Sequence, residues 1–422
     1  MLRNLFKELS WPDRIIFAVL SLTVDSIALW WRIGIIAVLT LAGVSLLRML
    51  YTRKLGNRTL SPLQRFCLWA MIAYFILYVV SAIVTSNHAE GWFKVGVKLY
   101  FFVLPALCLL SDTSYLTSGR IRALFQLLTA TLILRFVICI AICGVRLAQG
   151  IPFAELSNWQ LDPMGMHHNY LAMYLITALA FLYTCIVRIT KSDCRRLPFI
   201  IGAAVILVVY LFAISSRSGI VSLALLLMSC VVHLTFFRKK YKAALIVVLF
   251  SGALVAGLYL AMPSMFDRFA ALHLNRVADD RVVTWKCGMK IAQEHLLVGH
   301  GSGDYMPQLL VAYEEMNYPK AVRNNYNAHN QYIETLLETG LVGLVFLLVM
   351  FLAPFVAAFA KNRRSLLSVL AIMVIASQCF FESMLNRQMG VQFIALVYCL
   401  LILSQYPGRQ HDTCRLSQSD AS

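Results

Sequence analysis

Twelve apolar runs divide this chain, and they limit its possible folds more than any other feature. A helix needs about 20 apolar residues to cross the hydrocarbon core of a bilayer. With 60% hydrophobic and 14% charged residues, the chain is also too apolar to be covered by a water-facing surface. We therefore expect an all-α polytopic membrane protein of about twelve transmembrane helices. The runs lie near residues 15–30, 33–50, 63–85, 92–110, 121–146, 167–188, 197–214, 218–237, 242–262, 330–358, 366–381 and 388–405.

The distribution of basic residues predicts how these spans are oriented. If both termini are cytoplasmic, 23 of the 37 Lys and Arg residues fall in cytoplasmic segments, together with only six acidic residues. The formal net charge of +17 then arises on the cytoplasmic side, as the positive-inside rule requires. The charge therefore indicates membrane topology, and no nucleic-acid partner is expected.

The same topology places one long polar segment on the outer side of the membrane. It is too long for a simple connection, and residues 280–295 and 304–316 within it have the pattern of helices. We expect four regions: spans one to nine at 1–262, a periplasmic helical cap at 263–329, spans ten to twelve at 330–405, and a cytoplasmic tail at 406–422.

Three residues on the expected outer side could carry chemistry, and each has a simpler explanation. Arg217 lies in SSRSG, Arg281 in DDRVVTWKCGMK and His329 in NNYNAHNQYIETLLETGLVG. An arginine at the end of a span is commonly an interfacial anchor, and the face of a helix that carries Arg281 and Trp285 can simply pack. A lone histidine before a span is more often a solvent-facing or hydrogen-bonded residue than a base.

Charged residues also occur within the expected spans. Lys94 and Lys98 are one helical turn apart near the outer end of span four, and Arg135 lies well inside span five. Charge inside a membrane is costly and usually faces a cavity, a partner or a polar headgroup. These three residues are therefore candidates for contact with a substrate or lipid. The glycines of HLLVGHGSGDY predict a tight turn, because the segment lacks the lysine and Ser/Thr of a phosphate-binding loop.

Two consecutive segments resemble a known family. RVVTWKCGMKIAQEHLLVGHGSGDY, followed by AHNQYIETLLETGLVGLVFLL, is similar to the signature of the O-antigen ligase and polymerase superfamily of bacterial membrane glycosyltransferases. The segment MHHNYLAMYL, with Asn169 and Ala172, resembles another segment of that family. The length, the span count and the single large outer loop are most similar to the O-antigen ligases of Gram-negative bacteria.

The resemblance implies a membrane fold of the GT-C class, a location in the inner membrane and an active site facing the periplasm. It implies a glycan on undecaprenyl diphosphate as donor and a sugar hydroxyl of lipid A-core as acceptor. Arg217 and Arg281 would then bind the donor diphosphate, and His329 would be the catalytic base. Lys94, Lys98, Arg135, His168, Asn169 and Asn330 are further candidates for contact with substrate or membrane lipids.

The expected reaction is a direct displacement with inversion that needs no cofactor and no metal. A divalent cation on the diphosphate is the main rival mechanism, and Asp279 and Asp280 are the adjacent acidic pair that could hold it. The pair is adequately explained as a helix cap, and two arginines make a cation unnecessary.

Other functions remain open at this point. An O-antigen polymerase or a protein O-oligosaccharyltransferase would use the same type of donor with a different acceptor. A transporter or flippase for a lipid-linked sugar would also have many spans and intramembrane charges. It would leave the diphosphate bond intact.

Overall fold

The computed structural model describes residues 5–53, 56–57, 59–151, 164–261, 280–359 and 365–404, and the regular elements within these ranges are helices. The predicted all-α fold is thus confirmed for this part of the chain. Residues 262–279, which include Asp279, and the predicted tail at 406–422 lie outside the described residues.

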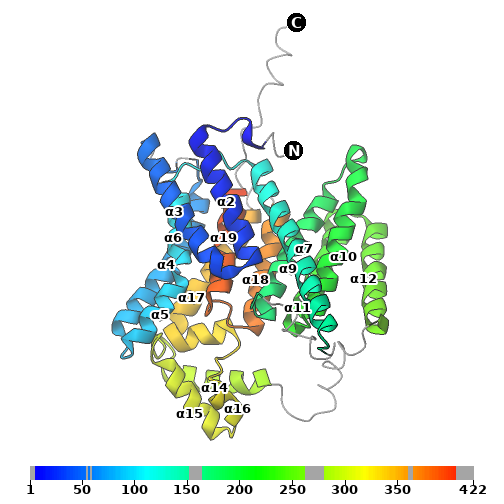
Figure 1. The fold of residues 1–422 in the computed structure, drawn as a ribbon. Coiled ribbons are helices and arrows are strands. Elements are labelled where there is room, and N and C mark those ends of the chain that lie inside the picture. The colour runs from blue at the N-terminus through cyan, green and yellow to red at the C-terminus, as the bar shows by residue number, and fades with distance from the viewer. Residues whose placement is uncertain are drawn as a thin grey trace.

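The twelve predicted apolar runs each coincide with one helix or with two consecutive helices (Figure 1). Among the described residues, seven helices are long and apolar enough to cross a membrane, and α5 with α6, bent by 41°, would make an eighth. The chain is therefore a multi-pass membrane protein, while the total of twelve spans stays a prediction. The helices at the twelve apolar runs are α2 (Trp11–Leu29), α3 (Trp31–Thr52), α4 (Pro62–Val84), α5 (His88–Lys98), α6 (Tyr100–Leu110), α7 (Ser118–Ala148), α9 (His168–Val187), α10 (Leu197–Ala213), α11 (Arg217–Val232) continued by η3 (His233–Phe237), α12 (Tyr241–Ala261), α17 (Gln331–Phe359), α18 (Leu366–Phe381) and α19 (Gln388–Ser404).

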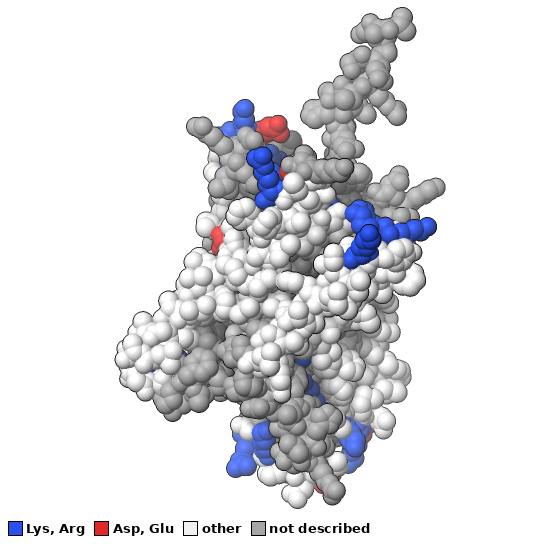
Figure 2. Space-filling view, turned by 90° about the vertical axis from the view of Figure 1, so that its right-hand side faces the viewer, with Lys and Arg blue, Asp and Glu red and all other residues white. Residues whose placement is uncertain are grey.

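The surface charge follows this architecture. On the face drawn in Figure 2, Lys and Arg gather toward the two ends of the molecule, and a mostly uncharged band separates them. Such a band is typical of a surface that contacts hydrocarbon, because a charged side chain there would lose its hydration.

Helix α9 forms the interior of the bundle. Of its apolar stretch, 78% is buried, and it packs against α7, α10, α11 and α18. Tyr174 fixes α9 to α19, because its ring stacks on Phe393 at 3.7 Å and its hydroxyl donates to the Met389 carbonyl at 2.5 Å. The first turn of α9, which carries Asn169, is therefore held on a rigid support.

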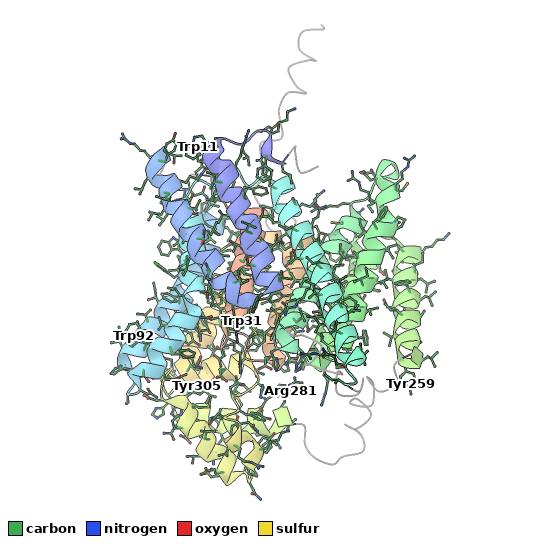
Figure 3. All side chains as sticks on the ribbon, in the orientation of Figure 1. Trp11, Trp31, Trp92, Tyr259, Arg281 and Tyr305 are labelled. Atoms are coloured by element: carbon green, nitrogen blue, oxygen red, sulfur yellow. The ribbon has the colours of Figure 1, made fainter. Side chains whose placement is uncertain are left out.

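Three further helices form a small cap at one end of the bundle. They are α14 (Asp280–Glu294), α15 (Tyr305–Glu315) and α16 (Pro319–Arg323), and the first two match the helices predicted at 280–295 and 304–316. The cap has a small apolar core that includes Cys287, Leu309 and Tyr313, and this core extends onto Leu337 of α17. Trp11 lies at the opposite end of the molecule from Tyr305 (Figure 3).

A break in α17 joins the cap to the bundle. Gly340 has a φ of 64° and a ψ of −161°, and a Cβ atom there would lie 2.3 Å from the carbonyl oxygen of Leu297. The glycine turn between α14 and α15 fits against this break, where Leu341 N donates to Leu296 O and His300 N donates to Leu337 O, both at 2.8 Å. Glycine is needed in this turn because the turn and α17 pack too closely to leave room for a Cβ atom.

The start of α15 is attached to the bundle as well. The Asp304 carboxylate accepts hydrogen bonds from the backbone N–H groups of Ser86 at 2.6 Å and Asn87 at 2.8 Å. Gly303 lies so close to this segment that a Cβ atom would come within 2.2 Å of the Asn87 carbonyl oxygen. The cap is therefore fixed to the loop between α4 and α5 as well as to α17.

Candidate active site

His329 lies in the loop before α17 and contacts a buried carboxylate. Its Nδ1 atom is 3.0 Å from Oε1 of Glu382, the residue that ends α18. The His329 side chain is 28% exposed, whereas that of Glu382 is 7% exposed. If Nδ1 carries the proton that Glu382 accepts, Nε2 is the ring nitrogen that can take a proton from a substrate. The pair can therefore act as a base with an orienting carboxylate.

The backbone of the His329 loop holds the imidazole in place. His329 has a φ of 46°, and its N–H donates to Oδ1 of Asn327 at 3.0 Å. Trp285 of α14 donates from Nε1 to the His329 carbonyl at 3.4 Å, and the Tyr326 ring packs edge-on at 5.4 Å. A left-handed backbone is uncommon outside glycine and is retained where surrounding contacts fix it, often at functional sites.

Glu382 is held in turn by the start of α9. Asn169 donates from Nδ2 to Oε2 of Glu382 at 2.8 Å. The Asn169 side-chain carbonyl accepts from Ser216 Oγ at 3.0 Å and from Ser218 Oγ at 2.9 Å. These two serines flank Arg217, the predicted diphosphate ligand at the start of α11. A continuous set of hydrogen bonds therefore links His329 to the segment that carries Arg217.

The SSRSG and HNYLA segments pack directly on one another, although they are almost 50 residues apart in sequence. A Cβ atom on Gly219 would lie 2.8 Å from the Cβ atom of Ala172. The N–H of Gly219 donates to Ser216 Oγ at 3.1 Å, which caps α11. The small residues in both segments allow α9 and α11 to approach closely, and this approach places Asn169 beside the serines.

Arg281 lies in the first turn of α14, at the junction between the cap and the bundle (Figure 3). Its guanidinium carbon is 5.9 Å from the ring centroid of Phe381, the residue before Glu382. Its charge acts on the imidazoles of His329 and His167. The structure therefore brings Arg281 to the neighbourhood of His329, while its role as a diphosphate ligand stays a prediction.

The ionisation of the pair follows from burial and charge. Burial lowers the pKa of His329, but the hydrogen bond and charge of Glu382 outweigh burial and raise this pKa above 6.5. For Glu382, burial raises the pKa, but the bond and charge of His329 lower it to about 2. The carboxylate is therefore ionised at neutral pH, and it stabilises the imidazolium that forms when His329 takes a proton.

Two of the predicted contact residues have structural partners. Asn330 caps α17, because its Oδ1 accepts from the N–H groups of Tyr332 at 2.9 Å and Ile333 at 3.2 Å. The His168 ring packs against that of His167 at a tilt of 31°, with ring centroids 4.2 Å apart. His167, which precedes α9, is within electrostatic range of Glu382 and His329.

Lys94 and Lys98 belong to a second, sealed cluster of charge. Lys94 Nζ is 3.0 Å from Oε1 of Glu338, and Lys98 Nζ is 3.9 Å from Oε2. Tyr78 donates to Glu338 Oε2 at 2.5 Å, and Lys98 lies 4.0 Å from the Tyr78 ring centroid. The Glu338 and Lys98 side chains are 0% exposed. These contacts give the two lysines a structural explanation within the fold.

Glu334, one turn before Glu338, connects the sealed cluster with the candidate site. Its carboxylate accepts from Tyr305 and Asn386 at 2.5 Å, from Ser383 Oγ at 3.3 Å and from the Ala328 N–H at 3.0 Å. Ala328 precedes His329, and Ser383 follows Glu382. Glu334 thus binds together the two loops that carry the candidate base and its carboxylate.

Arg135 has its own partners on a different element. Its guanidinium donates to the Ala28 carbonyl at 3.0 Å and to the Leu29 carbonyl. These carbonyls belong to the last turn of α2, where four carbonyl groups lack helical partners. Arg135 therefore caps α2 from inside the bundle.

No group of three or more His, Cys, Asp or Glu side chains that could hold a metal ion occurs in the described ranges. The Asp279 half of the predicted acidic pair lies outside the described residues, and Asp280 is the first residue of α14. The expected independence from metal is left to experiment.

Part of the chain is similar to a known protein family. Residues 202–348 match the sequence model of the O-antigen ligase family. The predicted resemblance is thereby confirmed. The matched O-antigen ligase segment includes Arg217, Arg281 and His329. No curated protein matches the chain. Members of this family are membrane glycosyltransferases, and the family implies a lipid-linked glycan and a lipid acceptor in general terms.

Asn169 and Glu382 lie outside the matched O-antigen ligase segment, and only Asn169 was singled out from sequence. Glu382 is not among the candidate residues that the sequence indicates. The one local signal for it was its position, since an acidic residue at the outer end of an apolar run is expensive unless it has a partner. That partner is 53 residues away in sequence, so only the fold reveals the contact.

Proposed function

We propose that this chain is an O-antigen ligase, which transfers a glycan from undecaprenyl diphosphate to a sugar hydroxyl of lipid A-core in lipopolysaccharide biosynthesis. The observation that carries the proposal is the 3.0 Å contact between His329 Nδ1 and the buried Glu382 carboxylate, in a chain that matches the ligase family. The family match alone does not distinguish a ligase from a polymerase. Our preference for a ligase rests on the single large outer loop of the sequence.

In the proposed reaction, the acceptor hydroxyl oxygen attacks the anomeric carbon as His329 Nε2 takes its proton. The bond from that carbon to the diphosphate breaks, and its electron pair leaves with the phosphate oxygen. Arg217 and Arg281 would stabilise the negative charge that grows there, because a guanidinium offers permanent charge and paired donors to phosphate. A single displacement of this kind inverts the configuration at the anomeric carbon.

Glu382 has a supporting role in this proposal. It does not touch the reacting atoms but fixes the tautomer and orientation of His329, in the way that a buried carboxylate serves the histidine of a catalytic triad. It also raises the proton affinity of the imidazole. Because two arginines can offset the charge of the diphosphate without a cation, we propose that transfer is metal-independent.

The activity can be tested with purified protein, undecaprenyl-diphosphate glycan and lipid A-core in the presence of EDTA. We expect ligated lipopolysaccharide from the wild type and none from His329→Ala or Arg281→Ala. Loss of wild-type activity in EDTA with recovery in Mg²⁺ or Mn²⁺ would overturn metal independence. A longer glycan that remains on undecaprenyl diphosphate would identify a polymerase, and intact donor on the opposite side of a proteoliposome would identify a transporter.

We propose that the protein lies in the inner membrane with cytoplasmic termini and with the cap in the periplasm. The charge distribution supports this orientation. A cysteine introduced at Val311, which is 51% exposed on α15, should react with a membrane-impermeant thiol reagent in spheroplasts. Reaction only after lysis would reverse the proposed orientation.

A further inference from the structure

The turn between α14 and α15 carries an exposed apolar patch. Leu297 and Val298 are each 68% exposed, and Leu296 beside them is exposed as well. No Lys, Arg, Asp or Glu occurs between Glu294 and Asp304. Three consecutive exposed apolar side chains are unusual on a surface that faces water, so the patch indicates contact with an apolar phase.

The patch continues the exposed apolar side of α17. Backbone hydrogen bonds place the two next to each other, because Leu341 N donates to Leu296 O at 2.8 Å and Val342 N donates to Leu297 O at 3.3 Å. One exposed apolar surface therefore extends from the far end of α17 to the turn. On α17, the exposed residues of this surface recur at helical spacing and include Val342, Val345, Leu352, Val356 and Phe359.

The length of α17 after its break predicts where the membrane surface lies. Residues 341–359 form a helix about 28 Å long at about 1.5 Å per residue, close to the hydrocarbon thickness of about 30 Å. The basic residues Lys361, Arg363 and Arg364 follow this segment in the sequence and mark its cytoplasmic end. The hydrocarbon core then reaches the break at Gly340, and any tilt of the helix would place the break deeper. The turn beside the break therefore lies at the edge of the hydrocarbon core.

The backbone of the turn suits an apolar environment. In hydrocarbon, N–H and C=O groups without a hydrogen-bond partner are costly. The carbonyls of Leu296 and Leu297 accept from the N–H groups of α17, and Gly299 N donates to the His295 carbonyl at 2.8 Å. These backbone groups are therefore paired within the protein, and the turn presents its apolar side chains to the outside.

The start of α5 supports the same membrane level. Trp92 and Phe93 are exposed there, and Trp92 lies at the outer edge of the bundle, at the end that carries the cap (Figure 3). Tryptophan is enriched where hydrocarbon meets the lipid headgroups. The loop before α5 is joined to the turn by the hydrogen bond from Asn87 N to Asp304, so the two segments lie side by side.

We propose that Leu297 and Val298 enter the acyl chains of the membrane leaflet on the cap side and anchor the cap to the bilayer. Lipid is the occupant of the patch because the patch is continuous with the lipid-facing side of α17 and lies at the edge of the hydrocarbon core. The anchor keeps α14, which carries Arg281, at the level of the membrane surface. The proposal does not depend on which reaction the candidate site performs.

The test uses the full-length wild-type protein in nanodiscs that contain a phospholipid with a photoreactive diazirine on its acyl chain, close to the glycerol. We expect lipid adducts on peptides that contain Leu297 and Val298, and on peptides that contain Val345, the positive control for lipid contact. Met316 is the negative control, because it is exposed at the end of α15 that is farther from the turn. Adducts at Val345 without adducts at the turn would overturn the proposal and indicate that water or a second copy of the chain covers the patch. Equal labelling of the turn and of Met316 would overturn it as well.

A matched pair of substitutions tests the anchor by stability. Leu297→Asp places a charge in the patch, and a charge in hydrocarbon is costly. Because the Leu297 side chain is mostly exposed, this substitution leaves the protein core intact. We expect Leu297→Asp to lower the unfolding temperature in nanodiscs and to lose the lipid adducts at the turn. Met316→Asp places the same charge on an exposed apolar position of the cap and should change neither, so equal unfolding temperatures of the two variants would overturn the insertion of Leu297.

Discussion

Two ion pairs occur on either side of the start of α17, and they differ in what surrounds them. The Lys94–Glu338 pair is closed off, with side-chain exposures of 7% and 0%, and its oxygens also meet Lys98 and Tyr78. The His329–Glu382 pair has a similar separation of 3.0 Å, but its histidine is 28% exposed. Both combine a cation with a buried carboxylate, so charge alone does not distinguish a structural pair from a functional one. The partial exposure of the histidine makes the second pair the candidate for function.

The largest effect should come from breaking the sealed pair. Glu338→Ala would leave Lys94 and Lys98 buried without their carboxylate, and removal of one partner of a buried pair typically costs about 3–5 kcal/mol. We expect a strong decrease in folded yield and in the thermal unfolding temperature in detergent. Glu315→Ala is the control, because its pair with Lys290 is more than half exposed on both sides. A similar, small change in both variants would show that the sealed pair is not structural.

Breaking the accessible pair should affect rate much more than stability. If His329 is the base, His329→Ala should lower kcat on the order of a hundredfold or more, because general base catalysis typically contributes about 10²–10⁴. The unfolding temperature should decrease less than in Glu338→Ala, because Asn169 still donates to the Glu382 carboxylate at 2.8 Å. Normal kcat in a pure preparation would remove His329 from the mechanism.

Replacing the Glu382 carboxylate should distinguish the two pairs further, because it should change how activity depends on pH. His329 must be neutral to act as a base, so wild-type activity should increase as pH rises through its raised pKa, above 6.5. Glu382→Gln removes the charge that raises this pKa, and the rising limb of the pH–kcat profile should move to lower pH. We also expect about a tenfold lower kcat at the plateau, because the imidazolium loses its stabilising partner. An unchanged profile would assign Glu382 to structure only.

The smallest effect should come from the helix cap between the two pairs. Asn330→Ala removes the side chain that accepts from the first N–H groups of α17, and loss of such a cap costs about 1 kcal/mol. The unfolding temperature should decrease slightly, and Asn330→Ser should restore it. If Asn330→Ala instead abolished activity without affecting stability, Asn330 would be a substrate contact.

Sequence reasoning predicted the helices well because their signal is local. The apolar runs and the cap helices at 280–295 and 304–316 are each defined by consecutive residues, and the structure has helices at these positions. The family resemblance likewise came from two short segments, and the match at 202–348 confirms it. The catalytic roles of Arg217, Arg281 and His329 stay predictions.

What the sequence left open depends on contacts between distant segments. Lys94 and Lys98 were recognised as costly charges, but their partner Glu338 is more than 200 residues away. Glu382 is not a candidate from the sequence, although the fold places it against His329. In both cases the sequence shows a charge that is costly in apolar surroundings. Only the three-dimensional packing shows which residue offsets that cost.

The break at Gly340 has a consequence for how substrates reach the site. Because the turn before α15 is bonded to both sides of this break, and Asp304 is bonded to the loop after α4, the cap is attached to the bundle at two separate places. The cap cannot move away from the bundle as a rigid unit without breaking several of these hydrogen bonds. For the proposed function, the lipid-linked substrates would therefore have to reach His329 laterally, from the membrane.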